Sequence, residues 1–271
     1  MIFDRIKHIL LTGIPQNNKR YTPPTMLFNE GWLLRLVLDW FAQPTNQTLN
    51  HPLAIPSGTR WYSEALLPTR FANKPRAERH THADGVIGHF TIGGTGEGDL
   101  PLAQDATHFV VIEAKLHSKL DPNVTNKPGY NQAARTVACM AEILFRSKRK
   151  SFDSFDKLGF YVIAPDTQIK KEVTFNDFLK NTDIEAKVKE RVQDYKENSK
   201  NEWLRDWFIP MLNIIDLKLL TWEDVLIFIQ QNDDKKGKIL WTYYELCKHY
   251  NNIGKKIDDA RLQELQDNLY D

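Results

Sequence analysis

Residues 107–116 read Thr-His-Phe-Val-Val-Ile-Glu-Ala-Lys-Leu and give the clearest strand signal in the chain. β-branched and aromatic residues fill the first part of this stretch, which is typical of a strand. Side chains two positions apart in a strand project to the same face of a sheet. Glu113 and Lys115 therefore share one face, and Ala114 lies on the other. The stretch predicts a strand that ends in a carboxylate next to an ammonium group.

A second strand is predicted just upstream, over residues 83–92, and a glycine-rich turn at 93–99 follows it. Because a hairpin would pair the two strands, we expect Asp84 to lie beside Glu113. Two carboxylates that converge at the end of a sheet offer the hard oxygen ligands that Mg²⁺ prefers. A lysine beside them can hold a water molecule and stabilise negative charge that develops on a phosphoryl group. Asp84, Glu113 and Lys115 thus predict metal-dependent phosphodiester hydrolysis.

The remaining segments predict an α/β fold. Residues 158–164 form a nearly continuous apolar run, which indicates a strand buried on both faces. Residues 130–145 carry alanines at helical spacing, so this helix can lie close against a sheet. The other expected elements are a helix at 26–41 with Thr25 as N-cap and Pro44 as its stop, a loop at 42–60, a strand at 64–71, helices within 174–208, a strand at 213–220, and a capping box at 221–224 that begins a terminal helical region.

Length and composition agree with such a fold. A chain of 271 residues with 41% hydrophobic residues can bury a sizeable core, which argues against a disordered, collagen-like or coiled-coil protein. The net charge of +1 excludes a polybasic tail. Cys139 and Cys247 are expected to be reduced, buried thiols. Since the N-terminus is charged and no long apolar stretch occurs, we expect a soluble, cytoplasmic protein that does not enter a membrane.

A second acidic residue followed by x-Lys also lies on a predicted strand, at Asp216-Leu-Lys218, and Pro165-Asp166 precedes it. A long, mostly helical segment separates these two pieces, so no hairpin joins them. The hairpin favours Asp84, Glu113 and Lys115 as the site. Two alternatives stay open: the site lies at Asp216 and Lys218, or Glu113 and Lys115 are only an ion pair at the end of a strand.

The succession of Asp84, Glu113-Ala114-Lys115, the helix that follows and the apolar strand at 158–164 resembles the PD-(D/E)xK nuclease superfamily. This superfamily includes restriction endonucleases and many DNA-repair and phage-defence enzymes. The resemblance spans residues 25–165 and extends more loosely to 220. It implies a restriction-endonuclease-like mixed β-sheet core flanked by helices at 1–220, with a helical C-terminal appendage at 221–271 packed on the core.

The resemblance also implies roles for individual residues. Asp84 and Glu113 would bind Mg²⁺, for which Mn²⁺ would substitute, the Ala114 carbonyl would assist, and Lys115 would orient the attacking water. An acid on the first helix often completes such sites, and Glu30 is the best placed candidate. Gln132 matches a glutamine found in some branches of the superfamily. Two positions depart from the pattern, because Ala83 replaces the proline of the name and Thr136 stands where a tyrosine is expected.

The resemblance therefore implies a Mg²⁺-dependent endonuclease that hydrolyses duplex DNA, in restriction or phage defence. Whether it acts as a homodimer is left open. Three alternatives remain: a non-catalytic nucleic-acid-binding or assembly module of the same fold, an RNA nuclease, and a helical interaction platform in the C-terminal half. His80 and His82 are expected at the surface or facing DNA, and a zinc site there would need a third ligand that the sequence does not identify. A local cluster of basic residues either binds phosphates or is ordinary surface charge; its members are Arg60, Arg70, Lys74, Arg76, Arg79, Lys115, Lys119 and Lys127.

Overall fold

The computed structural model describes residues 24–73, 77–78, 81–93, 100–124, 127–148, 151–152, 154–254 and 257–269. The chain divides into two compact units. The sheet unit comprises Val37–Asp224, and the helical unit comprises Met1–Leu36 together with Val225–Asp271. The predicted division after residue 220 stays a prediction.

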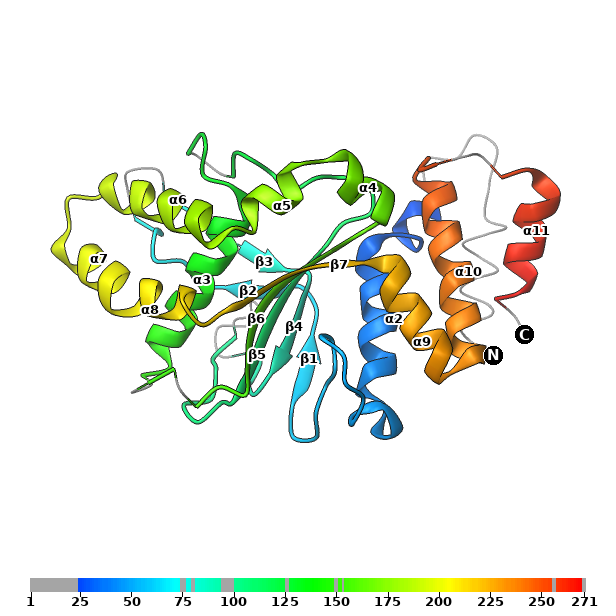
Figure 1. The fold of residues 1–271 in the computed structure, drawn as a ribbon, viewed down its shortest axis with the longest axis horizontal. Coiled ribbons are helices and arrows are strands. Elements are labelled where there is room, and N and C mark those ends of the chain that lie inside the picture. The colour runs from blue at the N-terminus through cyan, green and yellow to red at the C-terminus, as the bar shows by residue number, and fades with distance from the viewer. Residues whose placement is uncertain are drawn as a thin grey trace. The chain divides into compact units, whose positions relative to one another are not determined.

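The sheet unit contains a five-stranded mixed sheet with the strand order β1-β4-β5-β6-β7 (Figure 1). Its strands are β1 (Arg60–Tyr62), β4 (Gly85–Gly88), β5 (His108–Ala114), β6 (Lys157–Ala164) and β7 (Asp216–Thr221). The β1–β4 and β4–β5 pairs are antiparallel, and the β5–β6 and β6–β7 pairs are parallel. A separate two-stranded sheet pairs β2 (Ala65–Leu67) with β3 (Thr81–Ala83). The predicted α/β class with a mixed sheet is confirmed.

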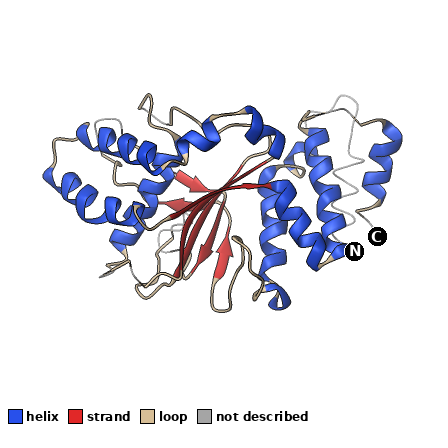
Figure 2. Cartoon of the chain, viewed as in Figure 1, coloured by secondary structure: helices blue, strands red, loops and turns tan. Residues whose placement is uncertain are grey.

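Helices flank this sheet (Figure 2). In the sheet unit they are α3 (Gln132–Arg146), α4 (Asp166–Lys171), α5 (Thr174–Phe178), α6 (Asn181–Gln193), α7 (Asn198–Trp203), a π-helical turn (Leu204–Phe208) and α8 (Ile209–Leu212). Short 3₁₀ turns lie at Pro24–Met26 and Pro44–Asn46. The boundary between the units falls within α2 (Glu30–Ala42) and within α9 (Trp222–Asn232). The helical unit also holds α10 (Asp234–Tyr250) and α11 (Asp259–Asp267). Within the described residues, no helix is long and apolar enough to cross a membrane.

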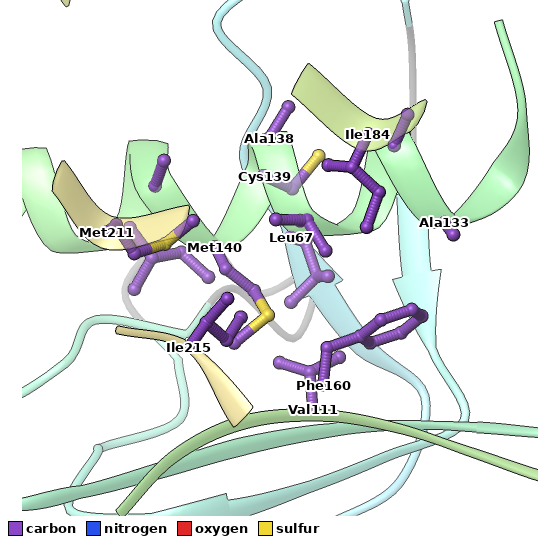
Figure 3. Close-up of a cluster of buried hydrophobic side chains, with 14 of the residues drawn as sticks. Leu67, Val111, Ala133, Ala138, Cys139, Met140, Phe160, Ile184, Met211 and Ile215 are labelled. Carbon is purple, nitrogen blue, oxygen red and sulfur yellow. The ribbon is translucent and has the colours of Figure 1, made fainter. Parts of the chain in front are cut away.

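The core of the sheet unit lies between α3 and one face of the sheet. Small side chains let α3 approach the strands, and alternate residues of β5 and β6 meet it, as expected for a pleated sheet. In Figure 3, Met140 of α3 points toward the strands that carry Val111 and Phe160, whereas Ala138 and Cys139 lie on the side of α3 near Ile184 of α6. Both cysteines are free and buried, as predicted.

Several expected boundaries were wrong, and the predicted strand at 213–220 is observed as β7 at Asp216–Thr221. The first long helix begins at Glu30 rather than at residue 26, because Asn29 accepts the Trp32 N–H at 3.0 Å and takes the capping role expected of Thr25. β1 (Arg60–Tyr62) begins at the last residue of the predicted loop at 42–60, since these residues pair with β4, and the predicted strand at 64–71 is observed only as β2 (Ala65–Leu67). The predicted strand at 83–92 breaks at Asp84, where the chain passes from the small sheet into the large one.

Candidate acidic site at the end of β5

Asp84 lies at the junction between the two sheets. The residue before it pairs with β2, and the residue after it pairs with β5. The β4–β5 ladder ends at the pair Gly85–Ile112. Beyond that pair, the Asp84 carboxylate takes over the role of a strand neighbour and accepts the Ala114 N–H at 2.7 Å. The break in the predicted strand thus directs the Asp84 side chain to the end of β5.

Glu113 is buried, with 4% of its surface exposed, and its carboxylate joins two further residues. Its Oε1 accepts hydrogen bonds from Lys115 Nζ at 2.6 Å and from Gln132 Nε2 at 2.5 Å. The lysine contact follows from strand geometry, because positions 113 and 115 share a face. The structure therefore brings together Asp84, Glu113, Lys115 and Gln132.

Gln132 reaches Glu113 because Asn131 caps α3. The Asn131 side chain accepts the Ala134 N–H at 2.8 Å, which places Gln132 as the first helical residue. The Gln132 side-chain oxygen accepts the Asp121 N–H at 3.2 Å, and its main-chain N–H donates to the Asp121 carbonyl at 2.8 Å. Gln132 thus ties Glu113 to the loop that follows β5.

Lys115 lies one residue beyond β5, yet its main chain is held on both sides. Its N–H donates to the Ile163 carbonyl of β6, and its carbonyl accepts the indole N–H of Trp222, each at 2.8 Å. The Lys115 side chain is mostly buried, at 13% exposure. No local sequence pattern connects Trp222 with Lys115, which lies 107 residues away.

Two carboxylates in one poorly solvated site repel each other. Burial, followed by the negative charge of Glu113, raises the pKa of Asp84 well above its usual value, while the Ala114 N–H and the Lys115 ammonium oppose the shift. A bound cation would relieve this repulsion. Asp84 Oδ1 and Glu113 Oε2 accept no hydrogen bond from the described residues, so one oxygen of each carboxylate can serve as a ligand.

This donor set fits Mg²⁺, which proteins often hold through one or two carboxylates, with water and substrate phosphates completing the coordination. The described residues contain no group of three or more His, Cys, Asp or Glu side chains arranged to hold a metal. The predicted ligand role of the Ala114 carbonyl stays a prediction.

Glu64 is a third carboxylate near Asp84 that sequence reasoning missed. Its charge contributes to the raised pKa of Asp84. Glu64 directly precedes β2, whose pairing with β3 sets Ala65 opposite Ala83. Its φ angle of 56° lies in the left-handed region that residues other than glycine rarely adopt. Only the β2–β3 register places Glu64 near Asp84, so the local sequence held no signal for it.

At the alternative site on β7, Asp166 does not lie beside Asp216. Lys218 pairs with Asp216 at 2.6 Å, and the Tyr161 hydroxyl donates to the same Asp216 oxygen at 3.0 Å. Asp216 lies opposite Gly159 in the parallel register, so Asp166 lies about 20 Å further along at roughly 3.3 Å per residue. Asp166 instead pairs with Lys170 on α4 at 2.6 Å.

The other predicted residues have varied positions. Glu30 is the first residue of α2 and belongs to the helical unit, and its role stays a prediction. His82 is exposed, whereas His80 and most of the glycine-rich turn lie outside the described residues. Besides Lys115, two of the predicted phosphate-binding residues are engaged within the protein: Lys127 pairs with Asp194 at 3.0 Å, and Arg70 donates to the Ser199 carbonyl at 3.2 Å. Lys74, Arg76 and Arg79 lie outside the described residues.

No family model matches this chain, and comparisons with curated proteins and with solved structures gave no match.

Proposed function

We propose that this protein is a Mg²⁺-dependent deoxyribonuclease that cuts DNA internally. One observation carries the proposal: two carboxylates and a lysine converge where β5 leaves a mixed sheet. One oxygen of Asp84 accepts the Ala114 N–H, and one oxygen of Glu113 accepts hydrogen bonds from Lys115 and Gln132. The second oxygen of each carboxylate accepts no hydrogen bond from the described residues. The resemblance to the PD-(D/E)xK superfamily supports this function and suggests a setting in restriction or phage defence.

The residues divide the chemistry between them. Asp84 Oδ1 and Glu113 Oε2 would hold Mg²⁺, which supplies Lewis-acid activation of the phosphodiester when bound. The Lys115 ammonium, held on Glu113 Oε1, is placed to orient a water molecule and to stabilise negative charge on the phosphoryl oxygens. The attacking water loses a proton to solvent as its oxygen forms a new P–O bond, the ester P–O bond breaks, and the leaving oxygen takes up a proton from solvent. Gln132 keeps the Glu113 carboxylate in one orientation.

The test is cleavage of supercoiled plasmid DNA in the presence of Mg²⁺, Mn²⁺ or EDTA. We expect the wild-type protein to nick the plasmid with either metal and not with EDTA. The variant Lys115→Ala should lose about 100-fold or more in rate, because it removes a charge that acts on the transition state. The matched control is Lys218→Ala, which removes a lysine from the other strand pair and should keep wild-type activity. Thermal unfolding of each variant checks that it is folded.

Three outcomes would count against the proposed site or the proposed substrate. Full activity in Lys115→Ala would show that the reaction does not use this site. Loss of activity in Lys218→Ala alone would move the site to β7. Absence of plasmid cleavage by wild type, together with cleavage of single-stranded RNA, would identify an RNA nuclease.

A further inference from the structure

The main chain of Lys115 is fixed at a point where a chain leaving a sheet usually gains freedom. β5 ends at Ala114, and the Lys115 N–H makes the last hydrogen bond of the ladder with β6. Lys115 uses both of its main-chain hydrogen-bonding groups, one toward Ile163 of β6 and one toward Trp222. The first of these bonds continues the parallel pairing of β5 with β6. The second bond comes from a side chain that belongs to neither strand.

Trp222 is itself held rigidly. It is 0% exposed and begins α9 directly after β7, whose last residue, Thr221, pairs with Ala164 of β6. The Thr221 hydroxyl caps α9 by accepting the Asp224 N–H at 2.9 Å. The next residue, Glu223, accepts the Asp166 N–H at 2.9 Å. Strand pairing, a helix cap and a side-chain hydrogen bond therefore fix the main chain on both sides of Trp222, and its indole reaches Lys115 from this position.

A second buried tryptophan shows that packing alone does not require such a bond. Trp203 is 2% exposed, and its indole N–H has no partner among the described residues. Trp222 and Trp203 are thus similar in burial and differ in whether the indole N–H donates. This difference makes Trp203 a matched control for the hydrogen bond of Trp222.

We infer that Trp222 is a positioning residue for Lys115, and the inference rests on the proposed nuclease function. The indole N–H fixes the Lys115 peptide, and the peptide in turn directs the ammonium group toward Glu113 Oε1. Without the bond, the chain after β5 can rotate, and the ammonium leaves the place where it acts on water and phosphate. Misplacement of a reacting group by about 1 Å can reduce the rate by about 100-fold.

The experiment compares Trp222→Phe with Trp203→Phe. Each change keeps a buried aromatic ring and removes an indole N–H. Cleavage of a DNA oligonucleotide with Mg²⁺ gives kcat and KM, and thermal unfolding gives stability. We expect kcat of Trp222→Phe to fall by about 10- to 100-fold at a nearly unchanged KM, and kcat of Trp203→Phe to stay close to wild type.

A double variant distinguishes a positioning role of Trp222 from a general loss of structure. Because Trp222 acts through Lys115, adding Trp222→Phe to Lys115→Ala should cause no further loss of kcat. Multiplied losses in the double variant would overturn the inference. An unchanged kcat in folded Trp222→Phe would overturn it as well, and so would equal losses of kcat in the two tryptophan variants.

A readout without catalysis keeps this inference separate from the proposed function. The NMR chemical shift of Lys115 Cε reports the surroundings of the ammonium group. It should change in Trp222→Phe and stay as in wild type in Trp203→Phe. If wild-type protein cleaves no nucleic acid, the proposed function fails, and this shift still decides whether Trp222 positions Lys115.

Discussion

Glu113 shows how one side chain can serve two purposes at the scale of single residues. One carboxylate oxygen receives Lys115 and Gln132, which fixes the orientation of the group, and the other stays available to a cation. Asp84 is arranged in the same way, with one oxygen on the Ala114 N–H. Both carboxylates are therefore oriented before any ligand binds, which lowers the cost of organising the site.

His108 carries a prediction at the same scale. It is 5% exposed, and its Nε2 is buried with no partner among the described residues. Burial, followed by the positive charge of Lys157, lowers the pKa of His108 from 6.5 to about 4. Between these two pH values the unfolded chain binds a proton that the folded protein does not. The free energy of unfolding therefore decreases as the pH is lowered through this window. Below about pH 4, His108 causes no further decrease.

The variant His108→Leu should remove this contribution. Relative to wild type, it should gain about 1–3 kcal/mol of stability as the pH falls from about 7 to about 4.5. Urea unfolding of both proteins at several pH values gives the difference, from which the titration of all other groups cancels. A difference that is constant across this range would contradict the expectation.

At the scale of elements, the β4–β5 hairpin depends on close approach of two backbones. A Cβ atom at Gly88 would lie 2.3 Å from the His108 carbonyl oxygen. This part of the hairpin is held by the pairing of Gly88 with Phe109 and by a 3.1 Å hydrogen bond from the His89 N–H to the same carbonyl. Any side chain at position 88 must push the strands apart, because the atom it meets belongs to the backbone.

We expect Gly88→Ala to lower the free energy of unfolding by about 1–3 kcal/mol. The control is Gly31→Ala in the first turn of α2, where a Cβ would meet only the ends of the Arg35 and Asn29 side chains, at 3.3 and 3.4 Å. Alanine favours a helix over glycine, so this change should be neutral or stabilising by up to about 1 kcal/mol. Guanidinium unfolding measures both variants, and equal effects would contradict the steric argument.

At the scale of the whole molecule, a buried ion pair joins segments far apart in the chain. Arg191 of α6 is 0% exposed, and its Nε donates to Glu78 at 3.2 Å, 113 residues away. Glu78 also accepts the Thr69 hydroxyl at 2.6 Å. The Arg191 guanidinium lies over the rings of Phe71 and Tyr195, at 5.0 and 5.1 Å. This network anchors Glu78, which lies three residues before β3 in the sequence.

Removing only one partner should be costly. Arg191→Met leaves Glu78 buried without its counter-charge, and we expect a loss of about 3–5 kcal/mol in the free energy of unfolding. The double variant Arg191→Met with Glu78→Gln removes both charges and should recover a large part of that loss. Chemical denaturation of the three proteins tests this, and a double variant as unstable as the single one would refute the charge argument.

Elements with a strong local sequence pattern could be predicted from the sequence. The apolar runs of β5 and β6 and the alanine spacing of α3 predicted elements within a few residues of their observed bounds. The period of a strand also placed Glu113 and Lys115 on one face, because two positions along a strand always return to the same side. The roles proposed for these residues stay predictions until cleavage is measured.

The rest of the fold and of the candidate site depends on how distant segments pair and pack. β1 is too short to be recognised from its own three residues, and its pairing with β4 creates it. Glu64 comes near Asp84 through the pairing of β2 with β3, and Trp222 reaches Lys115 across 107 residues. Such neighbours depend on how separate elements pair and pack, and a local sequence pattern contains no information about which distant residue fills the space opposite. The local sequence therefore determined that Glu113 and Lys115 share one face at the end of β5. Packing between distant segments determined which residues surround and orient them, because those neighbours come from other parts of the chain.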